Sequence, residues 1–294
     1  MEQEDQATSR ALPIPLTFSG IVAFSARSTS WLLLSWVCIA AFAATSTVGF
    51  LHSRWIPIIE KTAESLPSTS MLEGGRIDPL PTESPIQNQN GFLSVVVSGL
   101  TQSHGNLTSD FQITIEPTEI RFSSLFGSVA RAYPADATVD LAPAFLKPWW
   151  KSRKPLVTVG AFTSLMTSLL ATWTLLATIY FLPILFLTYC THRRIGLGKT
   201  WRLAGSILIP GALIMTLAII LYGFQLLSIL GLMAATALHL IVAWIYAIGS
   251  IRAIPRRSPS FPSVPVKGNP FSGETASEKI KRGSNPFGTT NDDS

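Results

Sequence analysis

The chain has 294 residues, of which 47% are hydrophobic and 13% are charged, and its formal net charge is +5. Soluble domains carry about twice this share of charged residues, and the apolar residues fall into blocks as long as the roughly 20 residues that span a bilayer. Many basic residues lie beside these blocks, which favours membrane orientation and argues against nucleic-acid binding. The first partner that the sequence predicts is the lipid bilayer.

Residues 1–28 form a mostly polar N-terminal segment, and the first apolar block follows at residues 29–51. The polar segment has few basic residues, and the block is longer than the hydrophobic region of a signal peptide, so we expect an uncleaved transmembrane helix. Within it, Ala40 and Ala44 form a small-xxx-small pair that would let another helix approach closely. Alanine is also a good helix former, and helix propensity explains these alanines equally well.

The segment at residues 52–155 is rich in Pro, Ser, Asn and acidic residues and has no long apolar run. Its first part, Leu66–Asn90, is dense in turn formers. Phe92–Val97 is a short, valine-rich run typical of a strand, and Ala137–Leu141 is a candidate for a further strand. The length of the segment suits a small β-rich domain.

An alternation of apolar and polar residues gives the most specific local prediction. It covers Phe111–Ile115 and resumes over Ile120–Ser124, with the turn-forming sequence Glu116–Glu119 between the two runs. This pattern predicts an antiparallel hairpin. On one period-two strand, Ile113 would face a core and Thr114 would face solvent.

Trp149 and Trp150 stand beside several lysines just before the second apolar block. Aromatic rings next to cations are typical of a membrane-interface anchor, with the rings at the level of the headgroups. A contact site for a protein or a nucleic acid is the alternative for this pair.

The second block, Leu156–Cys190, contains no charged residue. At about 1.5 Å per residue a straight helix would be about 50 Å long, which exceeds the hydrocarbon core of a bilayer. We expect either a helix that projects beyond the membrane or a kink at Pro183.

A short basic loop, His192–Arg202, follows the second block. The third predicted span is Leu203–Tyr222, with a kink expected at Pro210–Gly211, and the fourth is Leu227–Ile251. The tail at residues 252–294 is rich in Pro, Ser and Gly, and we expect it to be disordered.

The basic loop His192–Arg202 predicts the orientation, because short loops weigh most in the positive-inside rule. It carries four Lys or Arg residues, so it should be cytoplasmic. Both termini are then cytoplasmic, and residues 52–155 are extracytoplasmic. The lysines near Trp149 would lie outside, which is acceptable because long domains translocate largely regardless of charge.

His239 is the strongly polar titratable group that lies deep in a predicted span. Ionisable residues inside membranes are functional candidates, but we expect this ring to stay neutral and to bond an adjacent span. The cysteines Cys38 and Cys190 and the four histidines are scattered, and we find no catalytic motif. We therefore predict no enzymatic activity, no metal and no cofactor.

The tail contains two Asn-Pro-Phe triplets, and Asn-Pro favours a turn that would present the phenylalanine to a pocket. The triplets consist of Asn269, Pro270 and Phe271, and of Asn285, Pro286 and Phe287. They resemble the peptides that endocytic EH domains bind. This resemblance implies a eukaryotic endomembrane trafficking protein, whereas the alternative is a solvated tail of turn-prone composition.

The layout resembles a bacterial family of membrane proteins that is catalogued as a domain of unknown function. The residues that carry the resemblance are Leu66–Leu80 with Gly74 and Gly75, Phe111–Phe122, and Val139–Leu141 before Trp149. It covers most of residues 29–251. The resemblance implies the bacterial inner membrane as location and implies no activity.

The predicted fold is an α-helical membrane protein with four transmembrane helices and a small β-rich extracytoplasmic domain between the first and the second. Three of these helices lie within residues 156–251. The expected function is non-enzymatic: the outer domain binds or senses a protein partner in an envelope complex. The alternative is a permease-like subunit of a mechanotransmitting ABC system, since those subunits also have four spans and a domain between the first two.

Overall fold

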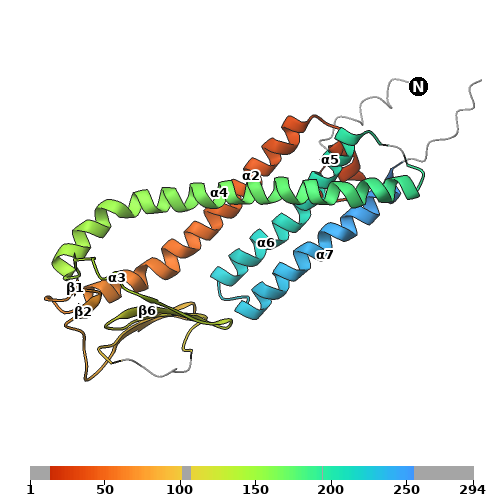
Figure 1. The fold of residues 1–294 in the computed structure, drawn as a ribbon. Coiled ribbons are helices and arrows are strands. Elements are labelled where there is room, and N and C mark those ends of the chain that lie inside the picture. Colours follow the sequence, from red (N-terminus) through yellow and green to blue (C-terminus); the bar gives the residue numbers. More distant parts are fainter. Residues whose placement is uncertain (1–13, 101–106, 194, 255–294) are drawn as a thin grey trace, which may run out of the picture. The chain divides into compact units, whose positions relative to one another are not determined.

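The fold is described from a computed structural model that covers residues 14–100, 107–193 and 195–254. Four helical segments in these ranges are long and apolar enough to cross a membrane (Figure 1). They are Thr29–Glu64, Pro143–Cys190, Leu197–Gly223 and Ile229–Ala253. A β region lies between the first and the second segment, as the sequence predicted.

The first helical segment continues past the predicted end of the span at residue 51. Helix α2 (Thr29–Phe50) passes through a π-helical turn (Leu51–Trp55) into α3 (Ile56–Glu64). The turn lies directly before Pro57, whose ring would clash with the carbonyl four residues earlier in a regular α-helix. The predicted start of the β domain at residue 52 is therefore wrong, because the chain remains helical up to Glu64.

Helix α4 (Pro143–Cys190) is one continuous helix of 48 residues. It begins well before the uncharged block and contains Pro148, Pro155 and Pro183. Figure 1 shows that it bends in its N-terminal part, drawn in yellow-green, where the first two of these prolines lie in the sequence. Proline is a common cause of such bends. The helix is continuous through Pro183, and its projection beyond a membrane stays a prediction.

The remaining helices are α1 (Phe18–Ser25), α5 (Leu197–Ser206), α6 (Leu208–Gly223) and α7 (Ile229–Ala253). The predicted basic loop is thus shorter than expected, because α5 begins at Leu197. The break between α5 and α6 lies at Ile207 and not at Pro210. Proline disturbs the carbonyl groups of the preceding turn, which places the break N-terminal to the proline itself.

Two arginines from the predicted basic loop hold the ends of other helices. The Arg193 guanidinium donates hydrogen bonds to the carbonyls of Ile251, Arg252 and Ile254 at the end of α7. Arg202 donates to the carbonyl of Ser25 at the end of α1, over 3.0 Å. A cation at a helix C-terminus satisfies unpaired carbonyls and opposes the helix dipole.

Small side chains form the contact surfaces between the long helices. Ala40 and Ala44 are completely buried on α2, which packs against α4 and α6. Trp36 lies beside them, and its Nε1 donates to the carbonyl of Gly205 over 3.3 Å. The expectation that Ala40 and Ala44 allow a close helix approach is confirmed.

The β region contains a three-stranded sheet in the order β2-β1-β8 and a five-stranded sheet in the order β3-β4-β5-β6-β7. The strands are β1 (Met71–Glu73), β2 (Arg76–Asp78), β3 (Ile86–Gln89), β4 (Leu93–Val97), β5 (Phe111–Ile115), β6 (Glu119–Ser124), β7 (Gly127–Ala132) and β8 (Val139–Asp140). The predicted hairpin is confirmed, because β5 pairs antiparallel with β6 and Ile115 is opposite Ile120. Strand β4 pairs with β5 in parallel.

The predicted exposure of the two faces of β5 is wrong. Thr114 is only 4% exposed, whereas Ile113 is half-buried. Gln112 donates a hydrogen bond to the Thr114 hydroxyl over 3.3 Å, and Arg121 is the cross-strand partner of Thr114. Long polar side chains on the same face therefore cover the short threonine.

One end of the five-stranded sheet contacts the ends of α2 and α6. The rings of Phe50, Phe92 and Tyr222 lie with their centroids 4.9–5.4 Å apart. The Tyr222 hydroxyl donates to the carboxylate of Asp110 over 2.7 Å. This contact fixes the N-terminal ends of β4 and β5 against the helices.

Candidate functional site

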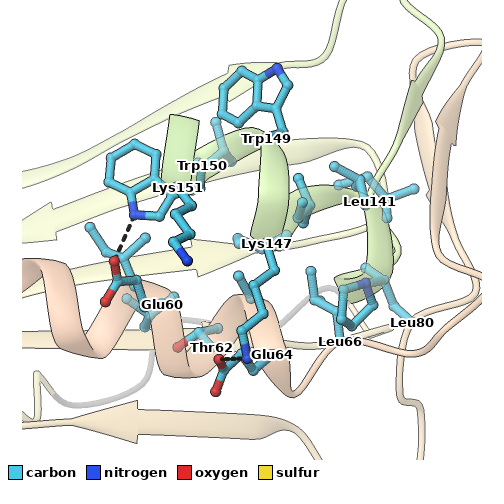
Figure 2. A pocket seen from close by; sticks show the side chains of 18 of the residues that line it. Glu60, Thr62, Glu64, Leu66, Leu80, Leu141, Lys147, Trp149, Trp150 and Lys151 are labelled. Carbon is cyan, nitrogen blue, oxygen red and sulfur yellow. Dashed lines mark hydrogen bonds and ion pairs between the residues drawn. The ribbon is translucent and has the colours of Figure 1, made fainter. Parts of the chain in front are cut away.

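A cavity of about 510 Å³ lies between α3, the first turns of α4 and one face of the five-stranded sheet (Figure 2). We call it the α3–α4 cavity. Its lining is mainly aliphatic and aromatic, and consists of Ile59, Glu60, Thr62, Ala63, Glu64, Leu66, Ile77, Leu80, Val95, Ile115, Ile120, Tyr133, Leu141, Pro143, Leu146, Lys147, Trp149, Trp150, Lys151 and Lys154. Pockets of this size and character hold small ligands in many proteins.

The sheet supplies apolar side chains to the cavity because of its register. Val95 is opposite Ile113 on the parallel pair β4–β5, and Ile115 is opposite Ile120 on the hairpin β5–β6. Residues two apart on a strand share one face. The alternation seen in the sequence therefore aims Val95, Ile115 and Ile120 at the cavity.

Three lysines of α4 border the cavity on the same side. Lys147, Lys151 and Lys154 are four and three residues apart, a spacing that aligns them along one helix face. Lys147 pairs with Glu64 over 2.8 Å, and Lys154 pairs with Glu60 over 2.9 Å. Lys151 forms no ion pair with any described residue.

The two tryptophans singled out in the sequence have different environments. Trp150 is half-buried, and its Nε1 donates to the Glu60 carboxylate over 2.8 Å. Trp149 is 43% exposed, and the Arg153 guanidinium lies 4.8 Å from its ring centroid. The hydrogen bond from Trp150 to Glu60 thus connects α4 to α3. Trp149 is the more exposed of the two tryptophans.

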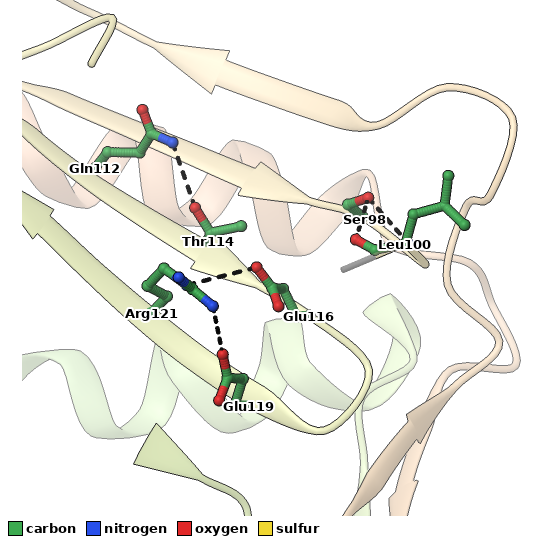
Figure 3. A network of polar contacts seen from close by, with 7 residues as sticks. All are labelled: Ser98, Leu100, Gln112, Thr114, Glu116, Glu119 and Arg121. Atoms are coloured by element: carbon green, nitrogen blue, oxygen red, sulfur yellow. Dashed lines mark hydrogen bonds and ion pairs between the residues drawn. The ribbon is translucent and has the colours of Figure 1, made fainter. Parts of the chain in front are cut away.

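A polar cluster lies around the turn between β5 and β6 (Figure 3). Glu116 is only 1% exposed, and Arg121 Nε lies 3.6 Å from one of its carboxylate oxygens. The same guanidinium bonds Glu119 over 2.7 Å. Neither carboxylate oxygen of Glu116 accepts a hydrogen bond from the part of the chain that the structure describes.

The Tyr133 hydroxyl is also buried, and it has no hydrogen-bond partner within the described ranges. Burial, together with the negative charges of Glu116 and Glu119, raises the pKa of Tyr133 from 10.0 to about 12. This side chain therefore stays protonated at physiological pH.

His239 lies on α7 beside a second cavity of about 200 Å³ between the long helices. Its Nδ1 is 2.5 Å from the carbonyl oxygen of Thr236, three residues earlier in the same helix. The expectation that the ring bonds an adjacent span is therefore wrong. The absence of a proton-transfer role stays a prediction.

Sequence reasoning missed the two carboxylates that face the lysines. Glu60 and Glu64 are four residues apart, which is the spacing of one helix face. The spacing of Glu60 and Glu64 predicts this acidic helix face only if the helix is taken to continue past residue 51. The Asn-Pro-Phe triplets at Asn269–Phe271 and Asn285–Phe287 lie outside the described residues.

No protein-family model matches the chain, and no curated protein or solved structure is significantly similar to it. The resemblance to a bacterial family of four-span proteins therefore stays a prediction.

Proposed function

We propose that this chain is a non-enzymatic integral membrane protein whose β region lies outside the cytoplasm and binds a partner molecule at the α3–α4 cavity. The cavity is the observation that carries the proposal. An apolar pocket of about 510 Å³ with charged residues at its border is a usual form of binding site. A location in the bacterial inner membrane is part of the proposal.

The charge distribution supports the proposed orientation. Arg193 lies between α4 and α5, and Lys199 and Arg202 lie in α5. Arg252 lies in the last turn of α7, where Arg193 bonds the carbonyls, so these four cations are at the same end of the helices. The positive-inside rule assigns such a cluster to the cytoplasm. The β region is attached at the opposite ends of α2 and α6, through Phe50 and Tyr222.

Cysteine labelling in intact cells tests this orientation. In a background with Cys38→Ser and Cys190→Ala, the exposed positions Ser128 and Gly198 are replaced singly by cysteine. A membrane-impermeant maleimide should label Ser128→Cys and spare Gly198→Cys until the cells are lysed. The reverse pattern would overturn the proposed topology.

Photocrosslinking in cells tests binding at the cavity. A photoreactive amino acid at Ile59, which borders the cavity and is 39% exposed, should give an adduct. The same amino acid at Val129, which is 68% exposed on β7 and does not line the cavity, is the control. Equal adduct yields at the two positions would contradict a binding site at the cavity.

The permease-like subunit of a mechanotransmitting ABC system is the second candidate. The continuous helices Thr29–Glu64 and Pro143–Cys190 favour it, because each joins the β region to an apolar segment without a flexible break. Such helices are suited to carrying a displacement from one end to the other. Copurification of an ATPase whose hydrolysis rate changes when α3 is crosslinked to α4 would support this candidate.

A further inference from the structure

The inner wall of the α3–α4 cavity is apolar. Ile77, Leu80 and Val95 line it and are each less than 10% exposed. Leu66, Leu141 and Leu146 extend the aliphatic surface toward the helices. Water gains few hydrogen bonds on such a surface, so an apolar occupant is favoured.

The size of the cavity suits one hydrocarbon chain. The cavity volume of about 510 Å³ lies within the range of roughly 300–1,000 Å³ that is usual for pockets holding one small ligand. A ligand with one acyl chain suits such a pocket better than a phospholipid with two.

The border of the cavity carries an excess of positive charge. Glu60 and Glu64 each pair with one lysine of α4, which leaves the charge of Lys151 unbalanced among the described lining residues. Figure 2 shows Lys151 on the same stretch of α4 as Trp150 and Lys147, across from the α3 carboxylates. An anionic headgroup is complementary to this border.

The border lies close to the uncharged part of α4. Lys154 is two residues before Leu156, where the block without charged residues begins. In the proposed topology the lysines lie near the outer surface of the bilayer, where long cationic side chains reach the headgroups. A ligand with one apolar chain can then pass from the outer leaflet into the cavity.

We propose that the α3–α4 cavity binds a single-chain anionic amphiphile, with its hydrocarbon chain against Val95, Ile77 and Leu80 and its headgroup at Lys151. This inference rests on the proposed function and names the chemistry of the partner. A fatty acid and a lysophospholipid with an anionic headgroup share this chemistry.

A fluorescent fatty acid provides the binding test. The full chain in nanodiscs of phosphatidylcholine is titrated with cis-parinaric acid, and energy transfer from tryptophan reports binding. Ala63 lines the cavity, so Ala63→Phe should fill part of it and weaken binding at least tenfold. Ala132→Phe makes the same change at an exposed position of β7 and should bind as the wild type does.

Competition identifies the headgroup. Palmitate and a lysophosphatidylglycerol should each displace the probe at about fivefold lower concentration than hexadecanol, the effect of one partly exposed charge pair. Lys151→Gln should abolish this difference. Lys61→Gln, an exposed lysine on α3 that does not line the cavity, should preserve it.

Crosslinking of a photoreactive palmitate to the wild-type protein tests binding without depending on whether a variant folds. Its adducts should map to residues 59–66 and 141–154. Three results would each overturn the inference. They are adducts confined to the apolar helices, binding by Ala63→Phe as tight as that of the wild type, and displacement by palmitate and hexadecanol at equal concentrations. If these results accompany specific crosslinking to a protein at Ile59, the proposed function stands and the amphiphile is wrong.

Discussion

The helical bundle and the β region fill their interiors in opposite ways. In the bundle, Ala40, Ala44 and Ala177 are completely buried, and buried hydroxyls such as that of Thr216 bond a carbonyl of their own helix. In the β region, a charged side chain, Glu116, is buried, and a cavity of about 510 Å³ remains open beside the sheet.

The difference shows where the chain depends on close packing and where it retains space and unpaired polar groups. In the proposed membrane location, small residues let helix backbones approach where lipid gives no hydrophobic advantage to helix association. A buried polar atom without a partner costs stability, so its presence calls for an explanation. The larger of the two cavities described above and most of the unpaired buried groups lie in or against the β region, which is why we place binding there.

The largest effect is expected from Arg121→Met in the β region. It leaves the Glu116 carboxylate buried without the nearby cation, which costs about 3–5 kcal/mol. Denaturant unfolding followed by circular dichroism measures the loss. Arg76→Met, at an exposed position of β2, is the control, and adding Glu116→Gln should restore much of the stability. If the double variant were no more stable than Arg121→Met, the buried charge would not be the cause.

In the bundle, Ala44→Leu should destabilise the protein by about 1–3 kcal/mol because the added atoms have no room. Ala237→Leu on the exposed surface of α7 makes the same change without a contact to disturb. Unfolding in sodium dodecyl sulfate, followed by tryptophan fluorescence, compares the two. Equal stability of the variants would contradict the close helix contact at Ala44.

The bundle has a charged contact of its own, at the end of α7. Arg193→Met removes the hydrogen bonds to the carbonyls of Ile251, Arg252 and Ile254, at a cost of about 1–2 kcal/mol. Hydrogen exchange should become faster in the last turn of α7. Arg252→Met removes the same charge from an exposed side chain and should leave exchange in that turn unchanged.

The smallest effect is expected from Tyr133→Phe. Removing a buried hydroxyl without a partner should stabilise the β region by up to ~1 kcal/mol at neutral pH. The pKa of Tyr133 is raised to about 12, so the wild type loses stability as the pH rises from 10 to 12, while the unfolded chain ionises first. The variant lacks this contribution, and a constant stability difference from pH 7 to 12 would contradict the raised pKa.

Composition alone was enough to predict the four long helices, because uncharged blocks of this length have few other structures available. The hairpin of β5 and β6 was also predictable, since it is local and alternates. Strands β1, β2 and β3 were missed because they have only three or four residues. Strand β7 was missed because its six residues are exposed on both faces. Gly74 and Gly75 both have positive φ in the two-residue turn between β1 and β2, and this signal could have identified that hairpin.

The α3–α4 cavity could not be predicted from local patterns. It requires that α3 and the start of α4 meet, although Glu60 and Lys154 are separated by the whole β region. The burial of Thr114 was equally hidden, because it depends on Gln112 and Arg121 lying across it. Long-range contacts of this kind leave no periodic trace in the sequence.

Because β1 pairs with β8, the three-stranded sheet can be completed only late in synthesis of the β region. Leu72 is opposite Val139, so the first strand has to wait until nearly the entire segment has left the ribosome. At about 5–20 residues per second this interval lasts on the order of several seconds. During that time the edge of β1 is unpaired on this side, and a chaperone or a neighbouring nascent chain can reach it before Val139 does.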